Sequence, residues 1–465
     1  MDGKWYHFIG IGGAGMSGLA RILLASGIRV SGSDLAASPV ISKLRESGAQ
    51  VFIGHAPENL QEGVDRVVVS SAIPPSNVEL RAARERGLEV MSRGELLARV
   101  MSRYRGIAVA GAHGKTTTSS MISLVLAQCG LDPTFIIGGE VNDIGGNAKL
   151  GKGEFLVAEA DESDGSFLKL EPYAAVITNI DNDHLDYYKN VEEIARAFQK
   201  FLSSLKPGGF AVLCTDNARV RELRPGKIEV LTYGLEGTPD FRAEEVTQTG
   251  FKTQAVIFRN NRKLGRLTLA VPGLHNVQNS LAAIAVGMRL GLSFPAIVEA
   301  LATFRGAQRR FQLVAQFNGI RVIDDYAHHP AEIRALLQAV VGLQPQRTIV
   351  VFQPHRYTRT YFLKEEFGEA FQGADLVIVT DIYAAGEKPL DGVTSELIVE
   401  ALRKNGQHVV YLGQLEAAEE FLLQEHRPGD VILTVGAGNV WTVGQNFARL
   451  LKDRSPKRSR DPQRI

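Results

Sequence analysis

The sequence lacks the features of a secreted or membrane-spanning protein. Cysteine is scarce: Cys129 and Cys214 are the only two in 465 residues, and their separation fits neither a metal-binding nor a redox motif. Both lie in apolar stretches, and we interpret both as reduced core residues. The chain begins without a basic-then-apolar signal, and apolar runs such as residues 107–111 are far shorter than a membrane span. We therefore expect a cytoplasmic protein with no membrane partner.

The sequence also lacks an excess of positive or negative charge. The sequence has 52 Lys and Arg against 51 Asp and Glu, a formal net charge of +1. Because a surface that binds nucleic acid is normally basic, we expect small molecules as partners and no nucleic acid. Apolar residues make up 45% and charged residues 22%, which is ordinary for globular domains. A chain of 465 residues exceeds one core, so we expect about three domains.

Short apolar runs alternate with helical patterns along most of the chain, which predicts α/β domains with parallel strands. The expected strands of the first domain are residues 7–11, 29–31, 51–53 and 67–71, with helices after Gly15 and from Pro39. Those of the second are residues 106–110, 155–158 and 174–179. Those of the third are residues 321–324, 348–353, 376–380, 409–412 and 431–435.

Two stretches differ from this alternation. Residues 228–272 alternate in polarity, which predicts antiparallel strands, and an alanine-rich helix is expected after them over residues 276–290. Residues 453–465 mix Ser, Pro, Lys and Arg without apolar periodicity, and we expect a disordered tail there. The predicted domains are therefore residues 1–98, 99–307 and 308–452.

A glycine-rich segment, Gly-Ile-Gly-Gly-Ala-Gly over residues 10–15, lies between the first expected strand and helix. Backbone amides at such a helix start favour a diphosphate. Asp34, after the next strand, has about the separation of an acid that binds a ribose hydroxyl. A turn that only packs the strand on the helix would use the same glycines. The order of strand, loop, helix and acid favours a nucleotide diphosphate, and both NAD and a UDP-sugar are candidates.

A second loop, Ala-Gly-Ala-His-Gly-Lys-Thr-Thr-Thr over residues 110–118, follows an expected strand and opens a helix. Its backbone amides can surround triphosphate oxygens, the Lys115 ammonium can neutralise the β and γ phosphates, and the Thr116 hydroxyl can bind Mg²⁺. Val109 occupies the place of the first glycine of the strict Walker spacing. Gly-Lys-Thr between a strand and a helix nevertheless favours ATP over a purely structural turn.

Two acidic segments follow strands: Glu-Ala-Asp-Glu-Ser-Asp over residues 159–164, and Asn-Ile-Asp-Asn-Asp-His-Leu-Asp over residues 179–186. Ligands gather at the carboxyl ends of parallel strands, and carboxylate groups suit hard divalent cations. A solvated loop would explain either segment alone. Both together, beside a phosphate loop, favour a magnesium site.

Four further segments are weak signals when taken one by one. They are His275-Asn276, Arg309-Arg310, Asp-Asp-Tyr-Ala-His-His-Pro over residues 324–330, and Pro-His-Arg-Tyr-Thr-Arg over residues 354–359. A helix cap, a solvated face or a turn would explain each. Their position at strand ends, in or beside an α/β unit that follows a nucleotide-binding one, favours a ligand site.

The order of these motifs along nearly the whole chain resembles the Mur ligase family. The resemblance implies a Rossmann-like N-terminal domain that holds a UDP-sugar, a central P-loop ATPase-type α/β domain, and a C-terminal Rossmann-like α/β domain that closes over an amino acid. Within the family, the chain is similar to the members that add L-alanine to the carboxylate of UDP-N-acetylmuramate through an acyl phosphate, in peptidoglycan biosynthesis. The implied partners are ATP as co-substrate, UDP-N-acetylmuramate and L-alanine, with Mg²⁺ as cofactor.

The resemblance also implies roles for individual residues. Catalytic roles fall to Lys115, Glu159, His184, Arg309 and Arg310, and Mg²⁺ would be held by Thr116, Glu159 and His184. ATP would contact Gly111, Ala112, His113, Gly114, Lys115, Thr116, Thr117, Asn276 at the adenine and Asp324 at the ribose. The UDP-sugar would contact Gly12, Gly13, Ala14, Gly15, Asp34, Ser70 and Ser71. The amino acid would contact Tyr326, His328, Arg356 and Arg359.

Two positions need separate mention. Ala327 stands where the alanine-adding members usually have glycine. Some sister ligases use a carbamylated lysine near the place of Gln199 and Lys200, and we assign no modification here. Three other functions stay open: a sibling ligase that adds a preformed peptide to the same sugar, a nicotinamide-dependent dehydrogenase built on the first motif, and a P-loop switch that hydrolyses ATP without a covalent product.

Overall fold

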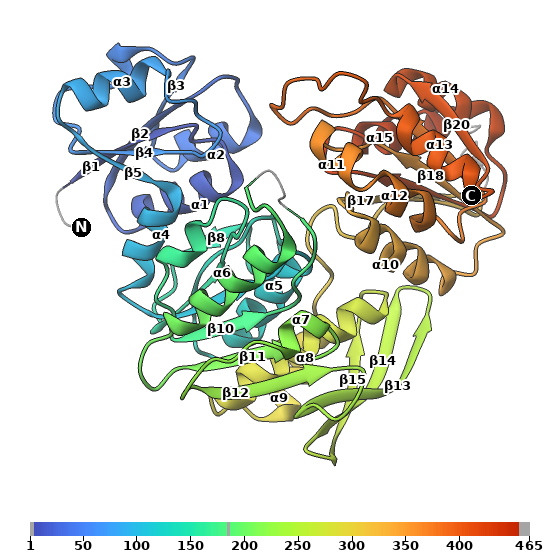
Figure 1. The fold of residues 1–465 in the computed structure, drawn as a ribbon, viewed down its shortest axis with the longest axis horizontal. Coiled ribbons are helices and arrows are strands. Elements are labelled where there is room, and N and C mark those ends of the chain that lie inside the picture. Colours follow the sequence, from blue (N-terminus) through green and yellow to red (C-terminus); the bar gives the residue numbers. More distant parts are fainter. Residues whose placement is uncertain (1–3, 184–186, 455–465) are drawn as a thin grey trace, which may run out of the picture. The chain divides into compact units, whose positions relative to one another are not determined.

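The computed structural model describes residues 4–183 and 187–454 (Figure 1). The described chain forms two compact units. Unit 1 holds the chain up to Gln308, except residues 248–252 and 271–274, which belong with the chain from Arg309 onward in unit 2. No helix within the described ranges is long and apolar enough to span a bilayer. Two sheets lie in unit 1 and one in unit 2, and the α/β fold class predicted from the sequence is confirmed.

The first sheet of unit 1 is parallel throughout, with the strand order β3-β2-β1-β4-β5. Its elements are β1 (Trp5–Ile9), α1 (Ala14–Ala25), β2 (Arg29–Asp34), α2 (Pro39–Glu46), β3 (Gln50–Ile53), β4 (Arg66–Val69), α3 (Val78–Glu85), β5 (Glu89–Ser92) and α4 (Arg93–Met101). The strand order changes direction between β1 and β4. The loop that follows β1 therefore lies at the switch point where such sheets bind ligands.

The second sheet of unit 1 has the order β15-β14-β13-β12-β11-β10-β6-β9-β7-β8. Its strands are β6 (Arg105–Ala110), β7 (Thr134–Ile136), β8 (Ala148–Lys149), β9 (Phe155–Glu159), β10 (Ala174–Ile177), β11 (Phe210–Cys214), β12 (Glu229–Gly234), β13 (Phe241–Thr249), β14 (Lys252–Arg259) and β15 (Arg262–Leu269). Its helices include α5 (Lys115–Gln128), α6 (Val191–Ser203), α8 (Leu274–Arg289) and α9 (Phe294–Ala302). β6 and β10 are neighbours, so the loops that follow them meet at one edge of the sheet.

The antiparallel strands expected over residues 228–272 are only partly observed. The expectation is confirmed for β14 and β15, where Thr253 lies opposite Leu269. It is wrong for β12, which pairs in parallel with both β11 and β13. One face of β12 is partly solvated, so its residues alternate in burial. Such alternation reports the exposure of a face and does not fix the direction of pairing.

The sheet of unit 2 has the order β16-β17-β21-β18-β19-β20. Its elements include β16 (Gln312–Phe317), β17 (Ile320–Asp325), α10 (Pro330–Val341), β18 (Arg347–Phe352), α11 (Tyr357–Phe362), α12 (Lys364–Ala370), β19 (Leu376–Thr380), α13 (Glu396–Lys404), β20 (Val409–Gly413), α14 (Leu415–Glu425), β21 (Asp430–Val435) and α15 (Trp441–Arg454). The strands from β17 to β20 pair in parallel, as expected. The added strand, β16, pairs antiparallel at the edge and is largely exposed, so its sequence carries a weak apolar pattern.

The core of unit 2 contains an aromatic cluster. The ring of Phe352 lies with its centroid 5.4 Å from that of Phe367 and 5.1 Å from that of Phe371. All three side chains are fully buried. Both cysteines are free thiols, and Cys214 is buried in unit 1 as expected. The expected core position of Cys129 is wrong, because its residue at the end of α5 is only half-buried.

Replacing Phe352 with Ala should lower the free energy of unfolding of unit 2 by about 3–5 kcal/mol, because the cavity cannot fully close. The control is Phe362→Ala, whose side chain is 56% exposed, and which should change that free energy by less than about 0.5 kcal/mol. Trp5 and Trp441 are the only tryptophans in the sequence, so urea unfolding in a Trp5→Phe background can be followed by the Trp441 fluorescence of unit 2. Equal midpoints for both variants would contradict the buried position of Phe352.

Candidate active site

The glycine-rich loop after β1 is held by the end of β2. The backbone amides of Gly10 and Ile11 both donate to the Ser33 carbonyl, at 2.9 and 3.0 Å. The amide of Gly12 donates to Oδ2 of Asp34 at 2.8 Å, and the Asp34 Oδ1 accepts from the Leu35 amide at 2.8 Å. Asp34 was predicted to bind a ribose. In the structure its carboxylate holds the loop backbone.

Two glycines of the phosphate loop have no space for a side chain. Gly111 has a φ of +137°, and a Cβ there would lie 2.1 Å from Oγ1 of Thr178. Gly114 has a φ of +81°, and a Cβ there would lie 2.7 Å from Oδ1 of Asn279. Both positions therefore require glycine for two reasons: the φ angle is positive, and a neighbouring atom occupies the place of a Cβ.

Side chains of the segment after β10 and of α8 hold this loop in place. Asn179 binds the His113 backbone twice: its Oδ1 accepts from the His113 amide at 2.9 Å, and its Nδ2 donates to the His113 carbonyl at 3.0 Å. The Thr178 hydroxyl donates to the same carbonyl at 2.6 Å. From α8, Oδ1 of Asn279 accepts from the Thr118 hydroxyl at 3.2 Å. Asn179 and Asn279 were not among the predicted site residues.

Lys115 lies folded against its own loop. Its ammonium donates to the carbonyl of Gly111 at 2.5 Å, to that of Ala112 at 3.3 Å, and to Oε1 of Glu162 at 2.7 Å. Burial alone would lower the pKa of Lys115, but the charges of Glu162 and Asp161 outweigh it and raise the pKa. The Lys115 ammonium is therefore charged at neutral pH. Glu162, which the sequence placed only within an acidic segment, is its main ionic partner.

A second cation, Arg93 of α4, joins this charge cluster. Its Nη2 donates to Oδ2 of Asp161 at 2.8 Å. Burial alone would raise the pKa of Asp161, but the charges of Arg93 and Lys115 lower it, so the carboxylate stays ionised. Arg93 begins α4, which follows β5 of the first sheet, whereas Asp161 follows β9 of the second sheet. The ion pair therefore links the two sheets of unit 1.

Both glycine-containing loops line one cavity of about 290 Å³ in unit 1. Its walls include Gly13, Ala14, Gly15, Met16, Ser70, Arg93, Lys115, Gly138, Glu159 and Asp161. Glu159 accepts from the Gly138 amide at 2.6 Å. Oxygen donors such as these carboxylates fit Mg²⁺. A larger cavity, about 760 Å³, lies at the other end of α1 beside Arg21 and Lys43, and it contains none of the predicted site residues.

The remaining predicted residues of unit 1 lie near these loops or outside the described ranges. Thr116 and Thr117 lie in the first turn of α5, where Thr117 is buried and Thr116 is half-buried. Ser71 is exposed next to Ser70, and Asn276 is buried in the first turn of α8. His184 lies outside the described residues.

Gln199 and Lys200, the residues near the place of a modified lysine in sister ligases, both lie on α6. The side-chain amide of Gln199 binds the backbone of Arg224 twice: its Nε2 donates to the carbonyl at 2.7 Å, and its Oε1 accepts from the amide at 2.8 Å. Lys200 is exposed on α6.

In unit 2, Arg309 and Asp324 form a largely buried ion pair. The Arg309 Nε donates to Oδ2 of Asp324 at 2.9 Å, and its two terminal nitrogens donate to the carbonyls of Gly436 and Gly438 at 2.6 and 3.0 Å. Oδ1 of Asp324 accepts from the Thr434 hydroxyl at 2.8 Å. Burial raises the pKa of Asp324, and the Arg309 charge opposes that rise. Arg309 and Asp324 were predicted for a phosphate and a ribose, whereas here they bind each other.

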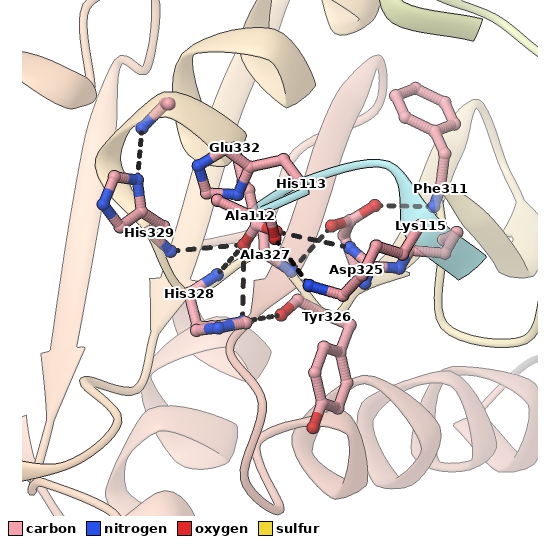
Figure 2. Close-up of polar contacts among 12 residues, drawn as sticks. Ala112, His113, Lys115, Phe311, Asp325, Tyr326, Ala327, His328, His329 and Glu332 are labelled. Carbon is pink, nitrogen blue, oxygen red and sulfur yellow. Dashed lines mark hydrogen bonds and ion pairs between the residues drawn. The ribbon is translucent and has the colours of Figure 1, made fainter. Parts of the chain in front are cut away.

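The turn between β17 and α10 is shaped by two carboxylates, as Figure 2 shows. Asp325 accepts from the amides of Phe311 and Ala327 at 2.7 and 2.8 Å, and burial raises its pKa to about 6. Glu332 accepts from the amide of His328 at 2.9 Å and closes a capping box at the start of α10. Ala327 does not adopt a positive φ, so this turn accommodates alanine in place of glycine.

Glu332 also lies 3.8 Å from the guanidinium of Arg310, the other candidate for a phosphate contact. The Arg310 guanidinium lies 5.3 Å from the centroid of the Tyr326 ring. The carboxylate that caps α10 therefore also orients Arg310 beside Tyr326.

Rings from separate strand ends form a row in unit 2. The Tyr326 and His328 rings lie 5.5 Å apart, those of His328 and His355 5.6 Å apart, and His355 stacks on Tyr383 at 5.7 Å. Nη1 of Arg359 lies 3.1 Å from Nδ1 of His355. Three of the four predicted amino-acid contacts, Tyr326, His328 and Arg359, thus gather around His355.

The fourth predicted contact, Arg356, has a φ of +72° and lies 3.9 Å from Glu387. Glu387 also accepts from the Thr358 hydroxyl at 2.6 Å. Tyr383 and Glu387 belong to the loop after β19, where no motif marks them in the sequence. Sequence reasoning therefore missed the loop that completes this cluster.

Three family descriptions match the chain. They are "Mur ligase family, catalytic domain" over residues 5–105, "Mur ligase middle domain" over residues 109–287, and "Mur ligase, glutamate ligase domain" over residues 309–438. The chain is 54% identical over 457 residues to a UDP-N-acetylmuramate–L-alanine ligase of Pelotomaculum thermopropionicum, and the match covers 97% of this chain and 99% of that protein.

Solved structures show the same similarity. The UDP-N-acetylmuramate–alanine ligase of Thermotoga maritima superposes with a TM-score of 0.83 at 31% identity, covering 97% of this chain and 99% of that one. A murein peptide ligase of Psychrobacter arcticus superposes with a TM-score of 0.73 at 24% identity, covering 98% and 100%, and shares the fold.

Replacing Asn179 with Ala should loosen the phosphate loop, because both side-chain bonds to His113 are lost. Each bond contributes about 1 kcal/mol, so we expect amide hydrogen exchange over residues 111–114 to become about ten-fold faster or more. Mass spectrometry of the exchanged protein measures this. As the control, Asn190→Ala removes a side chain that caps α6 and accepts from the Glu193 amide at 2.9 Å. That variant should leave loop exchange unchanged, and an equal effect of both variants would refute the role of Asn179.

Proposed function

This chain belongs to the Mur ligase family, and we propose that it uses ATP to join L-alanine to the carboxylate of UDP-N-acetylmuramate, a step of peptidoglycan synthesis. The observation that carries the proposal is the cavity of unit 1 lined by both loops. One loop suits a nucleotide diphosphate and the other a triphosphate. A cavity shared by both brings a sugar nucleotide within reach of ATP.

The chemistry requires activation of the sugar carboxylate, because a carboxylate is a poor electrophile at neutral pH. A carboxylate oxygen attacks the γ-phosphorus of ATP, and ADP leaves as an acyl phosphate forms. The amine of alanine then attacks the acyl carbon. The bond between that carbon and the bridging oxygen breaks, phosphate leaves with the oxygen, and the nitrogen loses a proton. Two anions must approach in the first step, so neutralising their charge is the main task of the site.

Residues of unit 1 are proposed to bind both nucleotides. Gly12, Gly13, Ala14 and Gly15 would hold the diphosphate of the UDP-sugar at the start of α1, with Ser70 and Ser71 beside it and Asp34 fixing the loop. The amides of residues 111–117 would surround the ATP phosphates, and Lys115 would exchange its carbonyl partners for the γ-phosphate. Arg93 and Lys115, which line the shared cavity, supply the positive charge where the two anions meet.

Mg²⁺ is proposed as the cofactor. Glu159 and the Thr116 hydroxyl would hold it together with phosphate oxygens, and His184 would contribute to a second site. When bound, the metal neutralises phosphate charge. Lys115 and Arg93 would bind and orient the anions around it.

Residues of unit 2 are proposed to bind alanine and the rest of ATP. Arg356 and Arg359 would hold the alanine carboxylate, with Tyr326 and His328 lining that pocket, because guanidinium groups bind carboxylates with two hydrogen bonds. Asp324 would bind the ATP ribose, Arg310 or Arg309 the transferred phosphate, and Asn276 of unit 1 the adenine. The corresponding domains are residues 1–98, 99–307 and 308–452. The free cysteines and the use of ATP suit the cytoplasm as its compartment.

The competing functions make different products. Incubation with ATP, Mg²⁺, UDP-N-acetylmuramate and one amino acid or peptide at a time, followed by mass spectrometry, separates them. We expect ADP, phosphate and a sugar nucleotide larger by one alanine residue. A product formed only with a preformed peptide would identify the sibling ligase, and NAD binding without ATP use would identify a dehydrogenase. ATP hydrolysis without a covalent product would indicate a P-loop switch.

Replacing Lys115 with Ala should slow amide formation about thirty-fold to a thousand-fold, because one charged phosphate contact contributes about 2–4 kcal/mol in the transition state. Binding of UDP-N-acetylmuramate, measured by calorimetry, should stay within about three-fold, since its loop follows β1 of the other sheet. Lys149→Ala, which removes a surface lysine paired with Asp132 at 3.0 Å, is the control. Loss of UDP-sugar binding in a folded Lys115→Ala variant would mean that the two sites are interchanged.

Replacing Arg359 with Ala should raise the KM for alanine about ten-fold or more, because a charged hydrogen bond contributes about 1.5–3 kcal/mol. The KM values for ATP and UDP-N-acetylmuramate should change by less than about three-fold. Arg334→Ala removes an exposed arginine of α10 in the same unit and should change none of the three. If neither Arg356→Ala nor Arg359→Ala changes the alanine KM, alanine binds elsewhere.

A further inference from the structure

A buried carboxylate lies behind the glycine-rich loop of the first sheet. Glu79 of α3 is fully buried. Its Oε2 accepts from the Ser33 hydroxyl, and its Oε1 accepts from the Asn59 side-chain amide and, at 3.1 Å, from the Ala56 backbone amide. None of the catalytic or binding roles proposed above uses this group. A buried charge with three donors is costly to assemble, so its position in the fold calls for a reason.

Two histidines extend the network. Nε1 of Trp5 donates to the Ser31 hydroxyl at 3.0 Å, and that hydroxyl lies 2.9 Å from Nδ1 of His7. Because an indole nitrogen only donates, the Ser31 hydroxyl accepts from Trp5. His7 Nε2 lies 3.6 Å from Oε2 of Glu79.

On the other side, Nδ1 of His55 lies 2.9 Å from the Ser33 hydroxyl. Since that hydroxyl gives its proton to Glu79, His55 donates its Nδ1 proton to Ser33. His55 Nδ1 also lies 3.5 Å from Oε2 of Glu79. Side chains from β1, from β2 and from the segment after β3 therefore all lie around one carboxylate.

This arrangement keeps Glu79 ionised. Burial alone would raise the pKa of Glu79, but the neighbouring His7 side chain and the hydrogen bonds from Ser33, Asn59 and the Ala56 amide outweigh burial and lower it. At neutral pH the group is a carboxylate, which accepts hydrogen bonds at both oxygens. A glutamine at this position would have an NH₂ group in place of one carboxylate oxygen, and that group would face the donors that the oxygen now accepts from.

Ser33 connects this network to the loop. Its hydroxyl donates to Glu79, while its carbonyl accepts from the amides of Gly10 and Ile11. The next residue, Asp34, accepts from the amide of Gly12 at 2.8 Å. Glu79 therefore binds the end of β2, and the same end of β2 binds three consecutive loop amides, those of residues 10–12.

We propose that Glu79 is a positioning residue for the UDP-sugar site, acting through Ser33 and Asp34 on the backbone of residues 10–12. This inference rests on the proposed function, which assigns that loop to the sugar diphosphate. Glu79 touches no substrate. Replacing Glu79 should therefore weaken the binding of the UDP-sugar. It should not change phosphoryl transfer or the phosphate loop, which follows β6 of the second sheet.

The test compares steady-state kinetics and calorimetry of Glu79→Gln and Ser33→Ala with those of the wild-type enzyme. For Glu79→Gln we expect the KM and Kd for UDP-N-acetylmuramate to rise about ten-fold, with kcat and the KM for ATP within about two-fold. Ser33→Ala should show the same split with a smaller rise. In the double variant, the Kd should rise no further than in Glu79→Gln, because both changes break one chain of contacts.

Two controls separate positioning from loss of stability. Leu80→Ala removes a buried apolar side chain of α3, 3% exposed, and should lower the melting temperature without changing the Kd for UDP-N-acetylmuramate. Glu85→Gln makes the same chemical change at an exposed position of α3 and should change nothing.

Unchanged Kd values in Glu79→Gln would overturn the inference, as would an equal loss of affinity in Leu80→Ala or multiplying effects in the double variant. If Glu79→Gln fails to fold, Ser33→Ala alone decides by the same criterion. If the wild-type enzyme binds UDP-N-acetylmuramate but makes no alanine adduct, the proposed function fails, and the calorimetric comparison still tests Glu79.

Discussion

Asn179 binds the peptide groups on both sides of one residue, His113, and the phosphate loop depends on that clamp. The glycines do not fix the loop conformation by themselves. Gly111 and Gly114 have positive φ angles, and a glycine backbone can also adopt many other conformations. Asn179 fixes the backbone between them, at 2.9 Å to the amide and 3.0 Å to the carbonyl. The amides that would face phosphate oxygens, and Lys115 one residue after Gly114, take their positions from this contact.

Charge balance is the second constraint, and it connects the loop to the proposed chemistry. Lys115 and Arg93 line the cavity with Asp161 and Glu159, and Glu162 binds the Lys115 ammonium at 2.7 Å. The carboxylates hold the cations in place before any substrate arrives. Incoming phosphate and carboxylate groups then meet positive charges that are already in the cavity, and Lys115 would exchange its carbonyl partners for phosphate oxygens.

The sequence allowed prediction of features that depend on neighbours along the chain. Parallel strands, the loop after β1 and the phosphate loop each need only a contiguous pattern of apolar residues, glycines and a lysine. The pattern did not reveal Asn179 and Asn279, which contact the loop from 66 and 161 residues away. It also assigned Asp34 to a ribose, because spacing alone does not show that the Gly12 amide takes one of its oxygens. The direction of β12 and the edge strand β16 were missed for the same reason: pairing is a long-range property.

The most direct test of the account is whether the sugar carboxylate is phosphorylated on the way to the amide. UDP-N-acetylmuramate labelled with ¹⁸O in its carboxylate, incubated with the enzyme, ATP, Mg²⁺ and alanine, should transfer one labelled oxygen to the inorganic phosphate released. Mass spectrometry of that phosphate gives the answer. One ¹⁸O per phosphate is the predicted result. Unlabelled phosphate alongside alanine adduct, or AMP and pyrophosphate in place of ADP, would contradict the mechanism.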